Sequence, residues 1–235
     1  MIVAKVYPTL IDAYEYWLKS DAPLQDFIDR INRVPTEMPE AAMKGTAYND
    51  MIDAMLEGKD VETAIHIVRN VPNDVYKWTH VYDLPDGDNQ NAVEFMFPKK
   101  ITDEIIRKLQ GAVAQVYNEA TIKTAFGDVV LYGYVDYVLR DTLIDLKTTS
   151  RYDFPKYLNS AQHPLYLYTA RQNMDVENFK YLVTDMRNIY EEAYHWNVNL
   201  EKMLVSMLNN LVSFIYDHKD MITNDKIFGL EPDKL

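Results

Sequence analysis

Two aspartates and a lysine stand in adjacent apolar runs of the sequence. Asp136 lies within residues 132–139, and Asp145 lies within residues 142–148, two positions before Lys147. Both runs predict strands, and residues two apart on a strand point to the same face. If Asp136 shares that face, two carboxylates and an ammonium group converge. Such a set suits Mg²⁺ or Mn²⁺, which polarise a phosphate and generate hydroxide while Lys147 orients water or stabilises charge.

A cross-strand salt bridge is the alternative interpretation of the same residues. A carboxylate on a buried strand is costly unless a cation meets it, so the pair could serve structure alone. An acid two residues before a lysine also occurs at Glu57–Lys59 and Asp217–Lys219, in a predicted helix turn and at a predicted helix end. Only Asp145–Lys147 lies in an apolar strand that follows another strand with an embedded acid.

Gln162 and Tyr166 are four residues apart in a predicted helix, so they share one helical face. There Gln162 could contact a phosphate or a base edge, and Tyr166 could stack on or bond to a substrate. Alternatively, Tyr166 packs in the core and Gln162 is solvated. Pro164 between them indicates that the helix is kinked or begins there.

The ordered motifs resemble the RecB-like branch of the PD-(D/E)XK nuclease superfamily, which includes phage lambda-type and CRISPR-associated exonucleases. They are Gly133-Tyr-Val-Asp136, Ile144-Asp-Leu-Lys-Thr-Thr149 and Gln162-x-x-x-Tyr166. The resemblance implies a restriction-endonuclease-like core in which Asp136, Asp145 and the Leu146 carbonyl bind a divalent metal. It also implies that Lys147 is catalytic and that Gln162 and Tyr166 serve the site.

The same resemblance suggests further site residues. Lys44-Gly45-Thr-Ala-Tyr-Asn49 is similar to a Gly-x-x-x-His motif of the family, with Asn49 at the histidine position. An asparagine oxygen is a weaker ligand than imidazole, so the number of metal ions and full activity stay open. Glu119 is the candidate for a further family acid, with a solvated strand residue as the alternative. Thr148 and Arg151 are candidate substrate contacts.

The composition excludes several classes of site. The chain has no cysteine, which excludes disulfides, thiolate zinc sites and the iron–sulfur cluster that some of these nucleases carry. Its seven glycines are dispersed and form no phosphate-binding loop, so no nucleotide cofactor is expected. Neither a signal peptide nor a membrane span is evident, and we expect a cytoplasmic protein, in the host cytoplasm if phage-encoded.

The charge of the chain is uneven. Its 235 residues include 36 acidic and 24 basic side chains, for a net charge of −12. Residues 99–187, which hold the motifs, carry 12 basic and 11 acidic groups. DNA binding rests on cations that neutralise phosphates. Because the middle segment is nearly neutral, the overall acidity does not exclude DNA.

The predicted elements give a mixed-sheet α/β fold with an N-terminal helical lobe and connecting strand and loop (1–98). A nuclease-like core with a C-terminal helix follows (99–235), in one compact domain. We expect helices at 9–18, 23–34, 38–57, 61–70, from Thr102 to 109, 154–172 and 200–218. We expect strands at 75–83, 112–125, 129–139, 142–148, 181–185 and 192–197, and a loop at 85–90.

These observations predict a metal-dependent DNA nuclease, of the phage exonuclease type used in recombination or repair. A catalytically inactive binding or regulatory module on the same fold is one alternative, and a structure-specific endonuclease is another. The expected partners are DNA, a recombination annealing protein and further copies of this chain.

Overall fold

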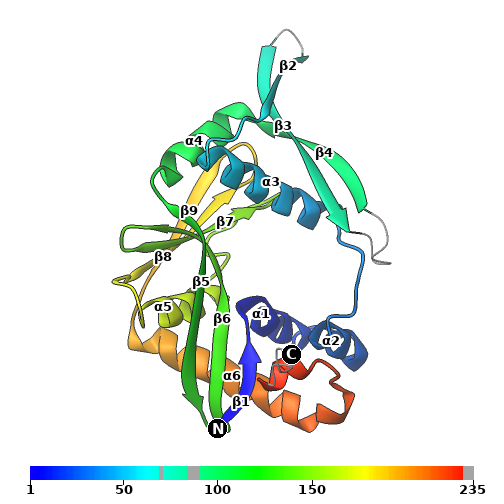
Figure 1. Ribbon diagram of the computed structural model, residues 1–235, viewed down its shortest axis with the longest axis vertical. Helices are drawn as coiled ribbons and strands as arrows, with labels where there is room; N and C mark the ends of the chain where they lie inside the picture. The colour runs from blue at the N-terminus through cyan, green and yellow to red at the C-terminus, as the bar shows by residue number, and fades with distance from the viewer. Residues whose placement is uncertain (69–70, 84–89, 230–235) are drawn as a thin grey trace, which may run out of the picture.

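The computed structural model describes residues 1–68, 71–83 and 90–229, and it confirms a mixed α/β fold (Figure 1). Two 3₁₀ turns, η1 and η2, follow the last helix. In chain order the elements are β1 (Ile2–Val6), α1 (Pro8–Trp17), α2 (Leu24–Ile31), α3 (Glu40–Leu56), β2 (Glu62–Val68), β3 (Val71–Asp83), β4 (Gln90–Pro98), α4 (Lys99–Leu109), β5 (Val113–Thr124), β6 (Gly127–Leu139), β7 (Thr142–Thr148), α5 (Gln162–Ala170), β8 (Asn178–Thr184), β9 (Ile189–His195), α6 (Val198–Asp217), η1 (Lys219–Met221) and η2 (Asp225–Phe228).

The main sheet has six strands, in the order β1-β6-β7-β8-β9, with β5 paired to β6. The β1–β6 and β7–β8 pairs are parallel, and the other pairs are antiparallel. Strands β1 and β7 share one edge of β6, because β1 pairs with residues 128–131 and β7 pairs with residues 137–139. Among the described residues, no strand pairs with that edge at residues 132–136. This opening lies directly beside Asp136.

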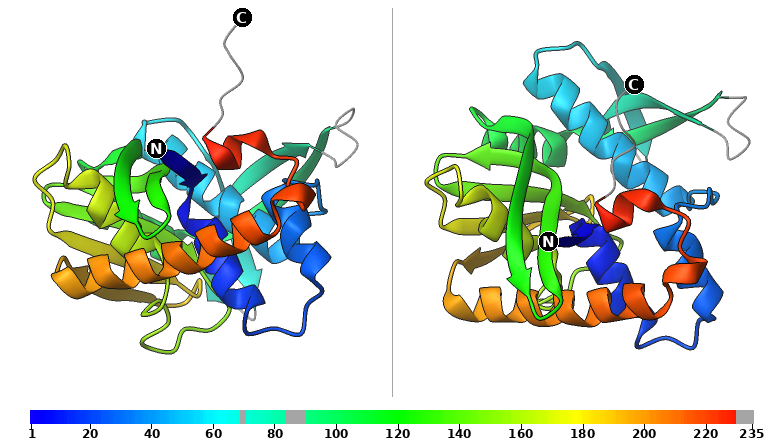
Figure 2. Two further views of the ribbon diagram at one scale, coloured as in Figure 1. Left: turned by 90° about the horizontal axis from the view of Figure 1, so that it is seen from below. Right: turned by 60° about the horizontal axis from the view of Figure 1, so that its bottom comes forward.

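Helices cover both faces of the main sheet, so the protein has two apolar cores. Helices α1, α2, α5 and α6 build one core, with α6 running across the sheet in Figure 2. Helices α3 and α4 build the other, together with the antiparallel sheet β2-β3-β4. Leu143 of β7 belongs to the first core, whereas Ile144 and Leu146 belong to the second. Strand β7 is therefore apolar on both faces, and its one acid, Asp145, needs a hydrogen-bonding or cationic partner to be buried there.

The structure confirms the predicted strands at 112–125, 129–139, 142–148, 181–185 and 192–197 within a few residues, and it confirms the C-terminal helix. The predicted helix at 61–70 is wrong, because residues 62–68 form β2. This segment is rich in β-branched residues, which favour a strand, and pairing with β3 supplies its backbone hydrogen bonds. Strands β1 and β4 were not predicted. Residues 84–89, which hold most of the predicted loop, lie outside the described residues.

Two predicted helices begin elsewhere. Helix α4 begins at Lys99, directly after Pro98, rather than at Thr102. Helix α5 begins at Gln162 rather than at residue 154, which places Pro164 in the first turn, where a missing N–H costs no helical hydrogen bond. The carboxylate of Asp12 accepts hydrogen bonds from the Ala161 backbone N at 2.5 Å and from Ser160 Oγ at 2.8 Å. A residue of α1 thus fixes the start of α5.

The division of the chain at residue 98 stays a prediction, and β1 from the N-terminal part is hydrogen-bonded into the main sheet. Over the described ranges, no helix combines the length and apolar character needed to cross a membrane.

Candidate active site

Asp136 lies where β6 and β7 separate. Tyr137 of β6 pairs with Ile144 of β7, and the antiparallel register places Asp136 opposite Asp145 one step further on. Beyond this point a side chain takes the place of the backbone hydrogen bonds between β6 and β7, because Asp136 Oδ2 accepts a hydrogen bond of 2.9 Å from the Leu146 backbone N. A buried N–H that lacks a strand partner is thereby satisfied, and the carboxylate is held at the opening in the sheet.

Asp145 is the centre of the candidate site and is only 3% exposed. Gln162 Nε2 donates a hydrogen bond to Asp145 Oδ1 at 3.1 Å. Lys147 Nζ donates to the same oxygen at 3.1 Å and lies 2.8 Å from Oδ2. The buried Oδ2 makes no hydrogen bond of good geometry. The structure thus brings together Asp136, Asp145, Lys147 and Gln162, as the motifs predicted.

The charges of this cluster shift each other's protonation. Burial, with the neighbouring Asp145 carboxylate, raises the pKa of Asp136 to about 7. Burial by itself would lower the pKa of Lys147, but the carboxylates of Asp145, Asp136 and Asp12 outweigh it and raise that pKa. Lys147 is therefore a fixed cation, whereas a negative charge on Asp136 is unfavourable beside the Asp145 carboxylate.

Tyr166 reaches the site through a close contact with Gly133. A Cβ atom added to Gly133 would lie 2.9 Å from Tyr166 Cε1 and 3.0 Å from its Oη, so only glycine leaves room for this ring. Tyr166 is buried, and burial together with the Asp145 and Asp136 carboxylates raises the pKa of its hydroxyl. Gly133, which begins the first predicted motif, and Tyr166, which ends the last one, are therefore in contact on the face of the sheet that α5 covers.

Helix α3 contributes the segment that holds the candidate Gly-x-x-x-Asn motif. Gly45 packs against β7, since an added Cβ would lie 3.0 Å from Thr148 Oγ1. Asn49, one helical turn later, has a buried Oδ1 that accepts no hydrogen bond from the described residues. Burying an amide oxygen without a partner costs about 1–3 kcal/mol, so this atom requires an explanation.

The donor atoms fit a hard divalent cation. Asp136 and Asp145 supply two carboxylates, and Asn49 on α3 supplies a buried amide oxygen that accepts no hydrogen bond from the described residues. Asp145 Oδ2 is occupied by the Lys147 ammonium at 2.8 Å. Mg²⁺ and Mn²⁺ prefer such oxygen ligands and keep several waters. In the described part of the chain, no three His, Cys, Asp or Glu side chains are grouped to hold a metal. A bound cation would therefore also need Asn49, a backbone oxygen or water as ligands.

The sequence did not reveal two further carboxylates near this cluster. Asp12 of α1 and Asp53 of α3 both have raised pKa values, chiefly because they are buried. The Lys147 ammonium lowers and the Asp145 carboxylate raises the pKa of Asp12. The Asp53 carboxylate helps to raise the pKa of Asp136. Asp53 accepts a hydrogen bond of 2.6 Å from Tyr137 Oη. The four-residue spacing from Asn49 to Asp53 was the available signal.

Glu192, also missed from the sequence, anchors the segment that joins Lys147 to Gln162. It is 1% exposed and accepts hydrogen bonds from the backbone N atoms of Lys156 and Tyr157, each at 2.9 Å. The hydroxyls of Tyr152 and Tyr194 donate to the same carboxylate. Burial alone would raise its pKa, but these hydrogen bonds prevail and hold the pKa below its usual value.

Two predicted site residues stand apart from the cluster. The Glu119 carboxylate pairs with Lys5 at 3.1 Å and accepts a hydrogen bond from the Tyr117 hydroxyl, and its neighbour on β6 is Tyr132 rather than Asp136. Arg151 is exposed and pairs with Asp153 at 2.7 Å. No hydrogen bond or ion pair of the described residues joins either of them to Asp136 or Asp145.

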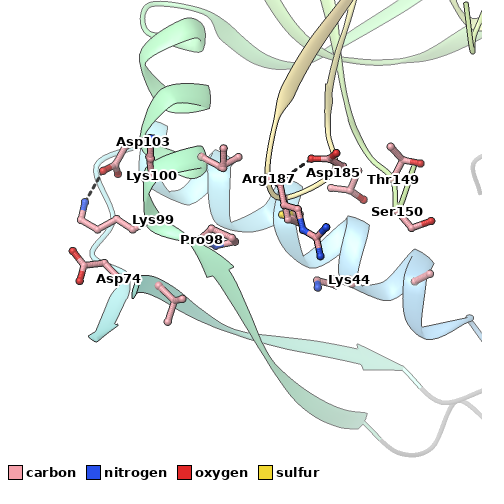
Figure 3. A pocket seen from close by; sticks show the side chains of 15 residues that line it. Lys44, Asp74, Pro98, Lys99, Lys100, Asp103, Thr149, Ser150, Asp185 and Arg187 are labelled. Carbon is pink, nitrogen blue, oxygen red and sulfur yellow. Dashed lines mark hydrogen bonds and ion pairs between the residues drawn. The ribbon is translucent and has the colours of Figure 1, made fainter. Parts of the chain in front are cut away.

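A groove of about 1190 Å³ begins at Thr148, one residue after Lys147. Figure 3 shows Lys44, Lys99, Lys100 and Arg187 around it, contributed by α3, α4 and the β8–β9 turn. Lys99 is held by Tyr76 and Asp103. The side chains of the other three cations make no hydrogen bond or ion pair with the described residues. Asp74, Asp103 and Asp185 also line the groove, so its charge is mixed.

No model of a known protein family matches this sequence, and no curated protein matches it. Among solved structures, the crystal structure of SSO0001 is similar over 48% of this chain, with 15% sequence identity and a TM-score of 0.39. The similarity covers 55% of the SSO0001 chain, so this protein spans about half of that length. Neither the fold nor the function follows from a similarity of this extent.

Proposed function

We propose that this protein is a metal-dependent nuclease that hydrolyses phosphodiester bonds in DNA. The observation that carries the proposal is the meeting of Asp136, Asp145, Lys147 and Gln162 where two strands separate. Each of these residues comes from a motif that resembles the RecB-like nucleases. The buried Asn49 Oδ1 on α3, which accepts no hydrogen bond from the described residues, adds an oxygen that a cation could satisfy.

The residues of the site divide the chemical work. A bound Mg²⁺ or Mn²⁺ would polarise the phosphoryl oxygens and lower the pKa of a water molecule. Asp136 and Asp145 would hold the cation, while Gln162 fixes the Asp145 carboxylate through its hydrogen bond to Oδ1. Lys147 places an ammonium group beside the same carboxylate, where it can orient the attacking water and stabilise charge on the phosphoryl group.

The adjoining groove suits the nucleic acid backbone. The side chains of Lys44, Lys100 and Arg187 have no hydrogen-bond or ion-pair partner among the described residues, and Thr148 brings the wall of the groove next to Lys147. Cations of this kind bind phosphates by charge and do not read sequence. The proposal therefore includes binding of DNA along the groove, with affinity that falls as salt increases.

The test incubates the full chain with linear duplex DNA and either Mg²⁺ or Mn²⁺. Lys147→Met and Asp145→Asn are expected to lower the hydrolysis rate by a factor of at least about 100, as loss of a directly acting group does. Lys59→Met is the matched control, because Lys59 forms the same kind of pair with Glu57 at 2.7 Å on the exposed surface. Equal rates in all four proteins would refute the assignment.

A catalytically inactive binding module is the second candidate. It is favoured by the completed Lys147–Asp145 ion pair and by Asn49 at the histidine position. Calorimetric titration with Mn²⁺ separates the two functions, because a nuclease binds the ion and loses it in the Asp145→Asn variant. Binding of DNA without any site-specific binding of Mn²⁺ would establish the module instead.

The finer assignment follows the resemblance to phage enzymes. We propose an exonuclease that requires a DNA end, acts in the cytoplasm and works with an annealing protein or with further copies of itself. A closed circular duplex distinguishes it from a structure-specific endonuclease. Degradation of linear DNA with the circle left intact supports the exonuclease, and cutting of a circle that carries a branch or nick supports the endonuclease.

A further inference from the structure

One face of the β5–β6 hairpin is open to solvent and carries aromatic side chains. The odd-numbered residues of β5 from Val113 to Lys123 are all exposed. Helix α5 covers the opposite face, where Tyr166 lies against Gly133. On the open face, Tyr117 of β5 stands directly across from Tyr134 of β6. Figure 1 shows the two long strands running side by side from the centre of the molecule to the N-terminus.

The exposure of these tyrosines is high for aromatic residues. Tyr134 is 58% exposed and Tyr117 is 46% exposed, with their ring centroids 5.2 Å apart. The Tyr117 hydroxyl donates a 2.6 Å hydrogen bond to Glu119, which limits the movement of this ring. Two broad ring faces in a restrained position cost little conformational entropy when a planar group stacks on them.

Cations are attached to the same face. Arg33 donates a 3.0 Å hydrogen bond to the Tyr132 hydroxyl, and its guanidinium carbon lies 5.4 Å from the ring centroid of Tyr7. Lys5 Nζ lies 5.1 Å from the ring centroid of Tyr132. The same Lys5 Nζ is 3.1 Å from Glu119, so this acid is neutralised where it stands. The face therefore combines aromatic rings with a net positive charge.

The aromatic face leads directly to the candidate active site. Asp136 follows Tyr132 and Tyr134 within a few residues of β6, at the point where β6 and β7 separate. The edge of β6 that neither β1 nor β7 occupies spans these residues. A chain of nucleotides whose phosphate reaches Asp136 would therefore pass over the tyrosines within a few nucleotides.

We propose that Tyr117 and Tyr134 form a stacking platform for unpaired nucleotides, with Arg33 placed to meet their phosphates. Stacked aromatic rings flanked by cations bind single strands through base faces and backbone charge, with little sequence preference. This site lies apart from the cationic groove beyond Thr148, on the other side of the carboxylates along β6 and β7. The path from the platform to Asp136 rests on the proposed nuclease function, but the binding of single strands does not.

The test measures fluorescence anisotropy of a labelled oligothymidine of about 12 nucleotides with the full chain, at fixed salt and in EDTA. Hydrolysis is absent under these conditions, so a failed nuclease assay leaves the measurement intact. Tyr117→Leu and Tyr134→Leu are each expected to weaken binding about tenfold, as loss of one stacked base does. Tyr117→Phe and Tyr134→Phe are expected to bind as the native protein does, because they keep the ring.

Tyr216→Leu is the matched control, since Tyr216 is 43% exposed but lies on α6. A hairpin duplex of similar length serves as the second probe, and its binding should not change in the leucine variants. The proposal is overturned if those variants bind the single strand normally, or if the phenylalanine variants lose as much affinity as the leucine variants. Equal loss of single-strand and duplex binding also overturns it. Failure here with metal-dependent hydrolysis intact would leave the nuclease assignment standing.

Discussion

Asp136→Asn is expected to stabilise the metal-free protein at high pH and to remove metal binding. In the native protein, burial and the Asp145 carboxylate raise the pKa of Asp136 to about 7. Asparagine keeps an oxygen that can accept the 2.9 Å hydrogen bond from the Leu146 N–H, and it carries no charge. The substitution therefore removes the repulsion while it preserves the local hydrogen bond.

The sign of the effect follows from proton linkage. A carboxyl with a raised pKa binds more protons in the folded state, so its contribution to stability is complete below the unfolded pKa and is lost as pH rises through about 7. From about pH 5 to about pH 8 the native protein should lose up to roughly 3 kcal/mol from this group, at about 1.4 kcal/mol per pKa unit. Because the Asp136 side chain is partly exposed, we expect about half of that value.

The assay is urea unfolding of both proteins in EDTA at the two pH values. The variant should gain about 1–2 kcal/mol over the native protein at the higher pH relative to the lower pH. Adding Mn²⁺ should then stabilise the native protein alone, because bound ligand shifts folding by mass action. A stability difference that stays constant with pH would refute the argument that Asp136 is a strained charge. Equal stabilisation of both proteins by Mn²⁺ would refute its role as a ligand.

Two further substitutions test the architecture around the site. Gly133→Ala should destabilise the protein by about 1–3 kcal/mol through overpacking against the buried Tyr166 ring, and Tyr166→Leu in the same chain should restore most of the loss in thermal unfolding. Glu192→Gln should cost about 1–3 kcal/mol by replacing an acceptor with a donor, and it should speed hydrogen exchange at the Tyr157 amide. The exposed neighbour Glu191 is the control, where glutamine should change stability by less than about 1 kcal/mol. Unchanged unfolding in Gly133→Ala, or unchanged exchange in Glu192→Gln, would contradict these contacts.

The groove beside Thr148 gathers basic side chains in an otherwise acidic chain, together with Asp74, Asp103 and Asp185. Lys99, Lys100 and Arg187 come from the nearly neutral segment 99–187, and Lys44 joins them from α3. The acidic majority lies elsewhere in the sequence. Net charge sets the long-range field, whereas local cations set where a phosphate binds.

Local patterns in the sequence determined much of the fold and the centre of the site. The apolar runs around Asp136 and Asp145 predicted two adjacent strands. Each run contains an acid, and a buried strand tolerates an acid only where a partner compensates its charge, so the same runs also marked the site. The period of a strand placed Asp145 and Lys147 together, and the period of a helix paired Gln162 with Tyr166. These relations span a few residues, so the backbone geometry alone enforces them.

Only the tertiary structure decided which distant residues complete the site. The contact of Asp12 with Ala161, and that of Gly133 with Tyr166, join segments that have no common periodicity. Strand β2 was missed for a related reason, because its pairing with β3 supplies the hydrogen bonds that its local helix-like pattern did not predict. The spacing of apolar residues predicts which side of a single helix or strand is buried. It does not predict which distant elements pack together, because that depends on the burial of both cores at once. The sequence therefore predicted that Asp145 and Lys147 lie together, and only the fold showed that Asp12, Asp53 and the groove beside Thr148 lie nearby.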